Sequence, residues 1–182
     1  MKWTAANIGD LTGRVIVVTG ANSGLGFEAT KALILHGATV VAACRDTTKG
    51  AVCASLPGPG RADVRALDLA DLASVTAFAD GIRTDYPVVD VLINNAGVMA
   101  LPRSETADGF ERQFGTNHLG HFALTGQLLP PLLAAPAARV VTTSSSAHRM
   151  GRMNFADLQS QQRYRRWAVY GQSKLANLLF TY

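Results

Sequence analysis

The sequence predicts an α/β fold built on a doubly wound parallel sheet, and two observations lead to this prediction. Short runs rich in Val, Ile and Ala alternate along the chain with longer stretches of helical character. The short runs are apolar throughout instead of alternating with polar residues, which is typical of parallel strands covered on both faces. Strand–helix–strand units of this spacing are expected to cross over in the right-handed sense.

The elements follow one another in a regular order. We expect five strands, over residues 15–18, 39–43, 64–67, 89–93 and 139–143. We expect five helices, over residues 24–36, 47–55, 72–84, 109–133 and 167–182. With 182 residues the chain fits one α/β domain, residues 1–182, with a full core.

Composition narrows the class of protein. With 48% hydrophobic and 16% charged residues, the chain is typical of a folded globular protein. Its apolar runs are too short to span a bilayer, and its first twelve residues resemble neither a secretory signal nor a membrane anchor, so we expect a cytoplasmic protein. The two cysteines match no metal-site or disulfide pattern, and Cys44 is expected to be a small buried side chain.

The net charge of +4 is mild, and no nucleic-acid-binding motif accompanies it, so no nucleic-acid partner is expected. Part of the positive charge is concentrated in one polar stretch. The pattern is compatible with a solvated loop and with a contact to an anionic substrate or surface. Its five arginines are Arg149, Arg152, Arg163, Arg165 and Arg166.

A glycine-rich turn follows the first predicted strand and opens the first predicted helix. Residues 19–26 read Thr-Gly-Ala-Asn-Ser-Gly-Leu-Gly. Glycine serves where φ is positive or where the backbone approaches a ligand closely, and free N–H groups at a helix start favour a pyrophosphate. Because the turn lies between an apolar strand and a helix, it predicts a Rossmann-type dinucleotide-binding site.

The end of the second predicted strand indicates which dinucleotide binds. An acidic residue there would bind the ribose 2′-hydroxyl of NAD, but the sequence reads Cys44-Arg45-Asp46. A guanidinium suits the 2′-phosphate of NADP, so the sequence predicts that NADP(H) is preferred over NAD(H). Asp46 either caps the next helix or partly offsets the preference that Arg45 confers.

Three motifs in order resemble the short-chain dehydrogenase/reductase family: Thr-Gly-x3-Gly-x-Gly, Asn-Asn-Ala-Gly and Tyr-x3-Lys. Four longer strings resemble its retinol dehydrogenase and WW-domain oxidoreductase-like branch, in which soluble bacterial members share them. They are NNAGVM at residues 94–99, NHLGHF at 117–122, SSSAH at 144–148 and SKLANLLF at 173–180.

The resemblance implies a strand order of 3-2-1-4-5 and a chain that continues through at least two more strands. The sequence ends inside the helix that carries the Tyr-x3-Lys motif, so we expect a C-terminally truncated member with later strands missing. The fifth strand would then form an exposed edge, and such an edge invites association, which makes a homo-oligomer one expected state.

The resemblance also implies a set of cofactor-binding residues. The pyrophosphate side is assigned to Gly20, Ser23, Gly24, Leu25 and Gly26. The adenine side is assigned to Asp68 and Leu69, and the cleft beside the first strand to Asn95, Ala96 and Gly97. Tyr170 and Lys174 are expected to contact the cofactor as well.

Tyr170 and Lys174 are four residues apart in a predicted helix and so share one face. A free tyrosine titrates at about pH 10, and a lysine ammonium about 4 Å away stabilises the phenolate by roughly 4 kcal/mol at an effective dielectric of about 20. Tyr170 can then give a proton to a carbonyl or take one from an alcohol. The resemblance adds Ser145, which bonds to the substrate oxygen, and Asn117, which helps to hold a water linking Lys174 to solvent. The choice of Ser145 among three adjacent serines rests on the resemblance alone.

The sequence therefore predicts an NADP(H)-dependent oxidoreductase that interconverts an alcohol with an aldehyde or ketone. A nucleotide-binding remnant with little or no turnover is the main alternative, and a lyase or epimerase on the same fold is a third. His118 and His121 lie three apart on a predicted helix, but no third ligand accompanies them, so we interpret them as packing residues and expect no metal. Tyr164 has no lysine four residues on and is not expected to be catalytic.

Overall fold

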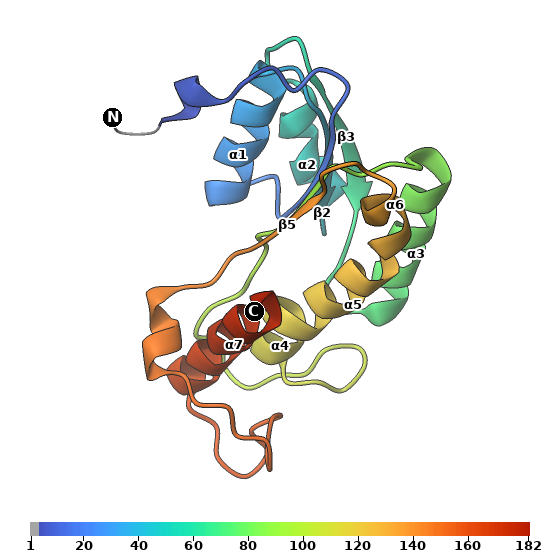
Figure 1. Ribbon diagram of the computed structural model, residues 1–182. Helices are drawn as coiled ribbons and strands as arrows, with labels where there is room; N and C mark the ends of the chain where they lie inside the picture. The colour runs from blue at the N-terminus through green and yellow to red at the C-terminus, as the bar shows by residue number, and fades with distance from the viewer. Residues whose placement is uncertain (1–3) are drawn as a thin grey trace.

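The computed structural model describes residues 4–182 and has a five-stranded sheet at its centre, with helices on both faces (Figure 1). All neighbouring strands are parallel, and their order is β3-β2-β1-β4-β5. The predicted doubly wound α/β fold and strand order are therefore confirmed. The strands are β1 (Val15–Thr19), β2 (Thr39–Cys44), β3 (Arg61–Ala66), β4 (Val91–Asn94) and β5 (Arg139–Thr142).

Helical segments connect the strands and follow the last of them. The α-helices are α1 (Gly24–Leu35), α2 (Thr47–Ala54), α3 (Leu72–Asp85), α4 (Arg112–Phe114), α5 (Gly120–Gln127), α6 (Leu129–Leu133) and α7 (Arg166–Thr181). Two 3-10 turns, η1 (Ala5–Asn7) and η3 (Ser146–Met150), and one π-helical segment, η2 (Gly115–Leu119), complete the set. Among residues 4–182 no helix has the length and apolar character that crossing a membrane requires.

Each face of the sheet has its own apolar core, because successive side chains of a strand point to opposite faces. Val17 of β1 packs in one cluster with Phe78 of α3 and Leu124 of α5. Val18, the next residue, packs in a second cluster with Ile34 of α1. Figure 1 shows α1 and α2 on one side of the sheet and α3, α5 and α6 on the other. Burial of each such side chain stabilises the fold by about 1.5–3 kcal/mol.

The segment predicted as one helix over residues 109–133 is divided in the structure. Its helical part begins at Arg112, because the carboxylate of Glu111 accepts the first free N–H groups of α4. A π-helical segment then separates α4 from α5, and α5 ends at Gln127, shortly before Pro130. The prediction of a single helix was wrong because apolar spacing reports neither a π-helical turn nor a break imposed by proline.

The strand ends differ from the prediction by one residue, and the starts of two strands differ by two or three. β3 begins at Arg61 instead of residue 64, and β4 begins at Val91 instead of residue 89. β3 is an outer strand in which no residue is fully buried, so the charged Arg61 and Asp63 can belong to it. Apolar runs mark strands that are covered on both faces, so they do not indicate the charged residues with which β3 begins.

Candidate active site

A cleft with a volume of about 780 Å³ lies where the carboxyl ends of β1, β2, β4 and β5 meet. Chain order reverses at β1, which lies between β2 and β4, and open α/β sheets bind ligands at such a reversal. The volume falls within the range of about 300–1,000 Å³ that is common for ligand sites. The cleft brings together most of the predicted site residues: Gly20, Ser23, Leu25, Arg45, Asp68, Leu69, Asn95, Ala96, Gly97, Ser145, Tyr170 and Lys174.

Three predicted residues, Gly24, Gly26 and Asn117, are not among those that line the cleft. Gly24 begins α1 with a φ of +52°, a conformation that favours glycine. Gly26 is buried, and a Cβ there would lie 2.2 Å from the carbonyl oxygen of Gly20 and 2.5 Å from Nδ2 of Asn95. The absence of that Cβ lets α1 approach the glycine loop. Gly26 therefore affects the shape of the cleft by packing against residues that line it.

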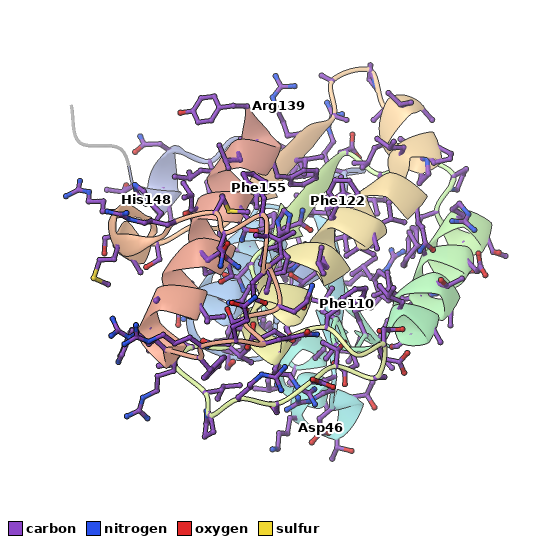
Figure 2. All side chains as sticks on the ribbon, turned by 90° about the horizontal axis from the view of Figure 1, so that it is seen from below. Asp46, Phe110, Phe122, Arg139, His148 and Phe155 are labelled. Carbon is purple, nitrogen blue, oxygen red and sulfur yellow. The ribbon has the colours of Figure 1, made fainter. Side chains whose placement is uncertain are left out.

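The start of α1 is suited to an anion. Ser23 occupies the N-cap position of α1, but within the described chain its side chain accepts no hydrogen bond from a helix N–H. Asp46 and Asp71, in contrast, cap the starts of α2 and α3 with their side chains. The labelled Asp46 can be found in Figure 2. Free N–H groups at a helix start carry partial positive charge, and Ser23 lines the cleft. Gly20, with a φ of +65°, brings the loop against Ala96 across the cleft floor, so these residues fit a pyrophosphate group.

The end of β2 carries positive charge at the cleft. Cys44 is buried, as predicted, and burial raises the pKa of its thiol to about 11, so it stays neutral. Arg45 is exposed and lines the cleft, and so does Lys49, which the sequence analysis did not single out. Asp46 caps α2 by accepting the Lys49 N–H at 3.1 Å, one of the two roles predicted for it. Its carboxylate also lies 3.8 Å from the Lys49 ammonium.

Tyr170 and Lys174 lie on one face of α7 and line the cleft together. Only 9% of Tyr170 and 4% of Lys174 is exposed. The Lys174 ammonium lies 5.9 Å from the centre of the Tyr170 ring and donates a hydrogen bond of 3.1 Å to the carbonyl oxygen of Thr143. Burial lowers the pKa of the Lys174 amine. The pair is thus held at the bottom of the cleft, shielded from bulk water.

The three adjacent serines differ in their hydrogen bonds. The Ser144 hydroxyl donates to the backbone carbonyl of Lys174 at 2.7 Å, so its hydrogen is already used. Ser145 Oγ accepts the N–H of Ala147 at 3.2 Å, and an accepted bond leaves the hydroxyl hydrogen available. Ser146 is exposed and is not one of the cleft residues. Ser145 is therefore the serine best placed to donate to a substrate oxygen.

Asn117 is fully buried in η2, and its side chain is committed to protein groups. Its Oδ1 accepts the Val98 N–H at 2.7 Å, while its Nδ2 donates to the Val98 carbonyl at 2.9 Å and to Ser173 Oγ at 3.0 Å. These bonds join the turn after β4 to α7. The side chain of Asn117 thus acts on the position of its neighbours.

Thr19, at the end of β1, was not singled out from the sequence although it begins the glycine motif. Its Oγ1 accepts the N–H groups of Asn95 and Ala96 at 2.9 and 3.0 Å. The Asn95 amide in turn donates to the Thr19 carbonyl at 2.9 Å. One signal could have revealed this role. Thr19 is a hydroxyl residue at the end of one strand, and the neighbouring strand ends in Asn-Asn-Ala, which supplies the N–H groups. Further cleft residues that the sequence analysis left out are Asn22, Ala43, Leu67, Val98, Met99, Thr116 and Thr143.

The remaining predicted features lie outside the cleft. His118 belongs to an aromatic cluster with Phe122 and Phe180, and Figure 2 labels Phe122 in this part of the molecule. Tyr164 donates to the Leu101 carbonyl and does not line the cleft with Tyr170 and Lys174. Within residues 4–182 no three His, Cys, Asp or Glu residues gather as a metal site. Three of the five arginines line a second hollow of about 230 Å³, namely Arg152, Arg163 and Arg165.

A sequence model of the short chain dehydrogenase family matches residues 14–182. The chain belongs to the short-chain dehydrogenase family. It is 51% identical to human retinol dehydrogenase 12 over 178 residues and 49% identical to human retinol dehydrogenase 11 over 175 residues. Each alignment covers 94% of this chain, and the chain spans only 55% of the length of each relative.

Solved structures show the same relationship. A protein from Mycobacterium paratuberculosis has a TM-score of 0.91 and 54% sequence identity, and the match covers 100% of this chain and 65% of that one. A short-chain dehydrogenase structure from Escherichia coli CFT073, solved in complex with NADPH, has a TM-score of 0.71 and 30% identity. That match covers 93% of this chain and 69% of the other.

Proposed function

We propose that the protein is an NADP(H)-dependent oxidoreductase that interconverts a small-molecule alcohol with an aldehyde or ketone. The observation that carries the proposal is a single cleft whose two ends are lined by different kinds of residues. An uncapped helix start and a glycine loop lie at one end, and Ser145, Tyr170 and Lys174 lie at the other. Membership of the short-chain dehydrogenase family and the names of the retinol dehydrogenase relatives support the same chemistry.

Each catalytic side chain has a distinct task in this proposal. NADP(H), when bound, supplies or accepts the hydride. Ser145 donates a hydrogen bond to the substrate oxygen, while Tyr170 gives that oxygen a proton during reduction or takes one during oxidation. The Lys174 ammonium stabilises negative charge on the Tyr170 oxygen, and this effect is strengthened because the pair is shielded from water.

The preference for NADP(H) over NAD(H) rests on the charges at the end of β2. Arg45 and Lys49 both line the cleft there, and buried Cys44 takes the place of an acid. Two cations favour a phosphate group, and a guanidinium can bind two of its oxygens at once. Solved relatives that carry NADP or NADPH are compatible with this choice. Location in the cytoplasm and assembly into a homo-oligomer stay predictions.

The test combines a binding titration with a turnover assay. NADPH and NADH are titrated against the protein, and the loss of NADPH absorbance is followed with a panel of aldehydes and ketones that includes retinal. Tight NADPH binding with absorbance loss is the expected result. Binding without turnover would favour the nucleotide-binding remnant, and a changed substrate without net NADPH loss would favour the lyase or epimerase. If neither cofactor binds, the proposal is wrong.

A further inference from the structure

His121, in the first turn of α5, is one of the most deeply buried polar residues, with 1% of its surface exposed. Both nitrogens of its ring lie at hydrogen-bond distance from protein oxygens. Nδ1 lies 3.0 Å from the backbone carbonyl oxygen of Asn117, and Nε2 lies 2.9 Å from Oγ1 of Thr19. The ring therefore connects the π-helical segment η2 with the end of strand β1.

The two contacts determine which nitrogen carries the hydrogen. A carbonyl oxygen can only accept, so Nδ1 must donate to Asn117. Burial lowers the pKa of His121 to about 4, so the ring is neutral near pH 7. In a neutral ring the other nitrogen accepts, and the Thr19 hydroxyl must therefore donate to Nε2.

The direction of this bond leaves Thr19 Oγ1 free to accept, and it accepts two backbone N–H groups, those of Asn95 and Ala96. These two residues line the cleft at the end of β4. A donating Nε2–H would instead compete with them for the lone pairs of the hydroxyl oxygen. The Thr19 hydrogen would then turn toward the Ile93 carbonyl, at the longer distance of 3.4 Å.

The Nδ1 contact fixes the other side of the cleft. Asn117, whose carbonyl receives it, holds Val98 through two side-chain bonds and Ser173 through a third. Ser173 directly precedes Lys174 on α7. A Cβ on Gly97 would lie 3.5 Å from the Lys174 ammonium and 3.1 Å from Oδ1 of Asn117, so this turn packs directly against the catalytic lysine.

We infer that His121 is a positioning residue for the cofactor cleft. In its neutral form, with hydrogen on Nδ1, it sets the direction of the Thr19 hydroxyl and thereby orders the turn formed by Asn95, Ala96 and Gly97 against Lys174. This inference rests on the proposed function, since the turn lines the site proposed for NADP(H).

The titratable groups near the ring lower the pKa of His121, as burial does, while the hydrogen bond to the Asn117 carbonyl raises it. Lys174 and His118 are the charged or titratable neighbours that influence His121, and each of them opposes a positive charge on its ring. Lys174 lies on α7, and His118 lies on η2, where its Nδ1 donates to Oδ1 of Asn177 at 3.2 Å.

The experiment compares two substitutions of similar shape, His121→Gln and His121→Met. The Gln amide can accept from Thr19, whereas the Met thioether is a poor acceptor. We expect His121→Met to weaken NADPH binding about tenfold, as the loss of a buried hydrogen bond implies, while His121→Gln retains most of the affinity. Thermal unfolding and circular dichroism establish that both variants are folded, and His118→Gln is the matched control on the same helical stretch.

A second readout needs no cofactor. All four histidines place Nδ1 at hydrogen-bond distance from a protein oxygen, so nitrogen-15 NMR must identify the His121 signals by their loss in His121→Gln. We expect these signals to show a neutral ring with hydrogen on Nδ1 and to stay unchanged on titration between about pH 8 and pH 5. A double-mutant cycle with Thr19→Val should also be non-additive in unfolding free energy, because both changes remove the same contact.

The outcomes separate this inference from the proposed function. A folded His121→Met protein that binds NADPH as tightly as the unmodified chain, or a His121 ring with hydrogen on Nε2, overturns the role of His121. If His121→Met does not fold, the NMR tautomer and the affinity of His121→Gln still decide. An unmodified chain that binds no NADPH contradicts the proposed function instead, and the tautomer together with the Thr19 coupling then decides whether the link exists.

Discussion

The two ends of the cleft are built in different ways. The glycine-loop end, residues 19–26, is defined by side chains that are absent: Gly20 adopts a positive φ, and Gly26 lies against backbone where no Cβ would fit. The catalytic end is defined by buried polar side chains, among them Asn117, Tyr170 and Lys174. Figure 1 shows α1, near the start of the chain, beside the sheet, and α7, at the end of the chain, next to α4 in the lower part of the view.

This difference decides how each end responds to change. The glycine-loop end depends on local backbone geometry. A single added methyl group there overlaps with neighbouring atoms, so it should lower both the stability of the fold and the affinity for the cofactor. The catalytic end depends on hydrogen bonds between distant segments, so a change there can remove one chemical step and leave the packing intact. The predictions below test this contrast, from the largest expected effect to the smallest.

Tyr170→Phe should separate chemistry from binding. The change deletes only the hydroxyl that transfers the proton and keeps the ring, whose centre lies 6.2 Å from that of Trp167. We expect turnover to fall by about 10²–10⁴-fold, the usual contribution of a positioned acid or base, while the NADPH affinity is unchanged. Initial rates and a binding titration on the same samples measure both. A Phe variant that keeps most of its rate would mean that another residue supplies the proton.

Acid should destabilise the fold through His121. The folded pKa of this residue is about 4, below the ordinary value of 6.5, because burial disfavours the charged ring. The stabilisation that the folded state gains from a neutral His121 is fully present above about pH 6.5. It is lost as the pH falls toward 4, because in this range His121 of the unfolded chain binds a proton and His121 of the folded chain does not. The total loss is about 3 kcal/mol in unfolding free energy.

Urea unfolding at several pH values measures this effect, with His121→Gln as the reference. Both proteins share the other groups that titrate in acid, including His118, whose pKa burial also lowers. The difference between the two curves therefore isolates His121. Parallel curves for the two proteins between pH 6.5 and 4 would show that His121 is not held neutral.

Gly26→Ala should affect stability and NADPH binding together. Its Cβ would lie 2.2 Å from the Gly20 carbonyl oxygen, which is backbone and cannot give way cheaply, and 2.5 Å from Nδ2 of Asn95, whose side chain is hydrogen-bonded to Thr19. We expect a loss of about 1–3 kcal/mol in unfolding free energy, the usual cost of overpacking. Gly126→Ala, at an exposed position of α5 with nothing within 4 Å of the added Cβ, is the control and should stabilise the protein by about 1 kcal/mol. Equal effects at the two positions would contradict the steric account.

The same contrast explains what could be predicted from the sequence. The strands, their order and the glycine loop follow from local patterns, because residues 15–26 carry an apolar strand, a turn and a helix start in one stretch. Asp46 as a helix cap is likewise a local feature, and the structure shows it. The hydrogen bond between Thr19 and Asn95 joins residues 76 positions apart, and the bond between Asn117 and Ser173 joins residues 56 positions apart. No local pattern reports which partners meet.

The divided helix and His121 were missed for a related reason. Apolar spacing over residues 109–133 records which face is buried, and a π-helical turn changes that spacing too little to be recognised. His121 was interpreted as a packing residue because its partners, Thr19 and the Asn117 carbonyl, can be known only once β1 and η2 lie side by side. The Ser145 register was taken from resemblance, and the bonds of Ser144 now give it a physical basis.

The smallest expected effect concerns cofactor choice at the end of β2. Arg45 and Lys49 are both exposed, so water and salt weaken their attraction for a phosphate. We expect Arg45→Ala and Lys49→Ala each to weaken NADPH binding by about 1–2 kcal/mol and to leave NADH binding unchanged, since NADH has no 2′-phosphate. Removing the second cation as well should bring the two cofactors to similar affinities. Titrations with both cofactors at low and at high salt measure this, and Lys31→Ala, at an exposed position of α1 that does not line the cleft, serves as a control for net charge. Equal affinities for NADPH and NADH in the unmodified protein would contradict the preference, and an equal loss for both cofactors in the variants would place these cations at the pyrophosphate.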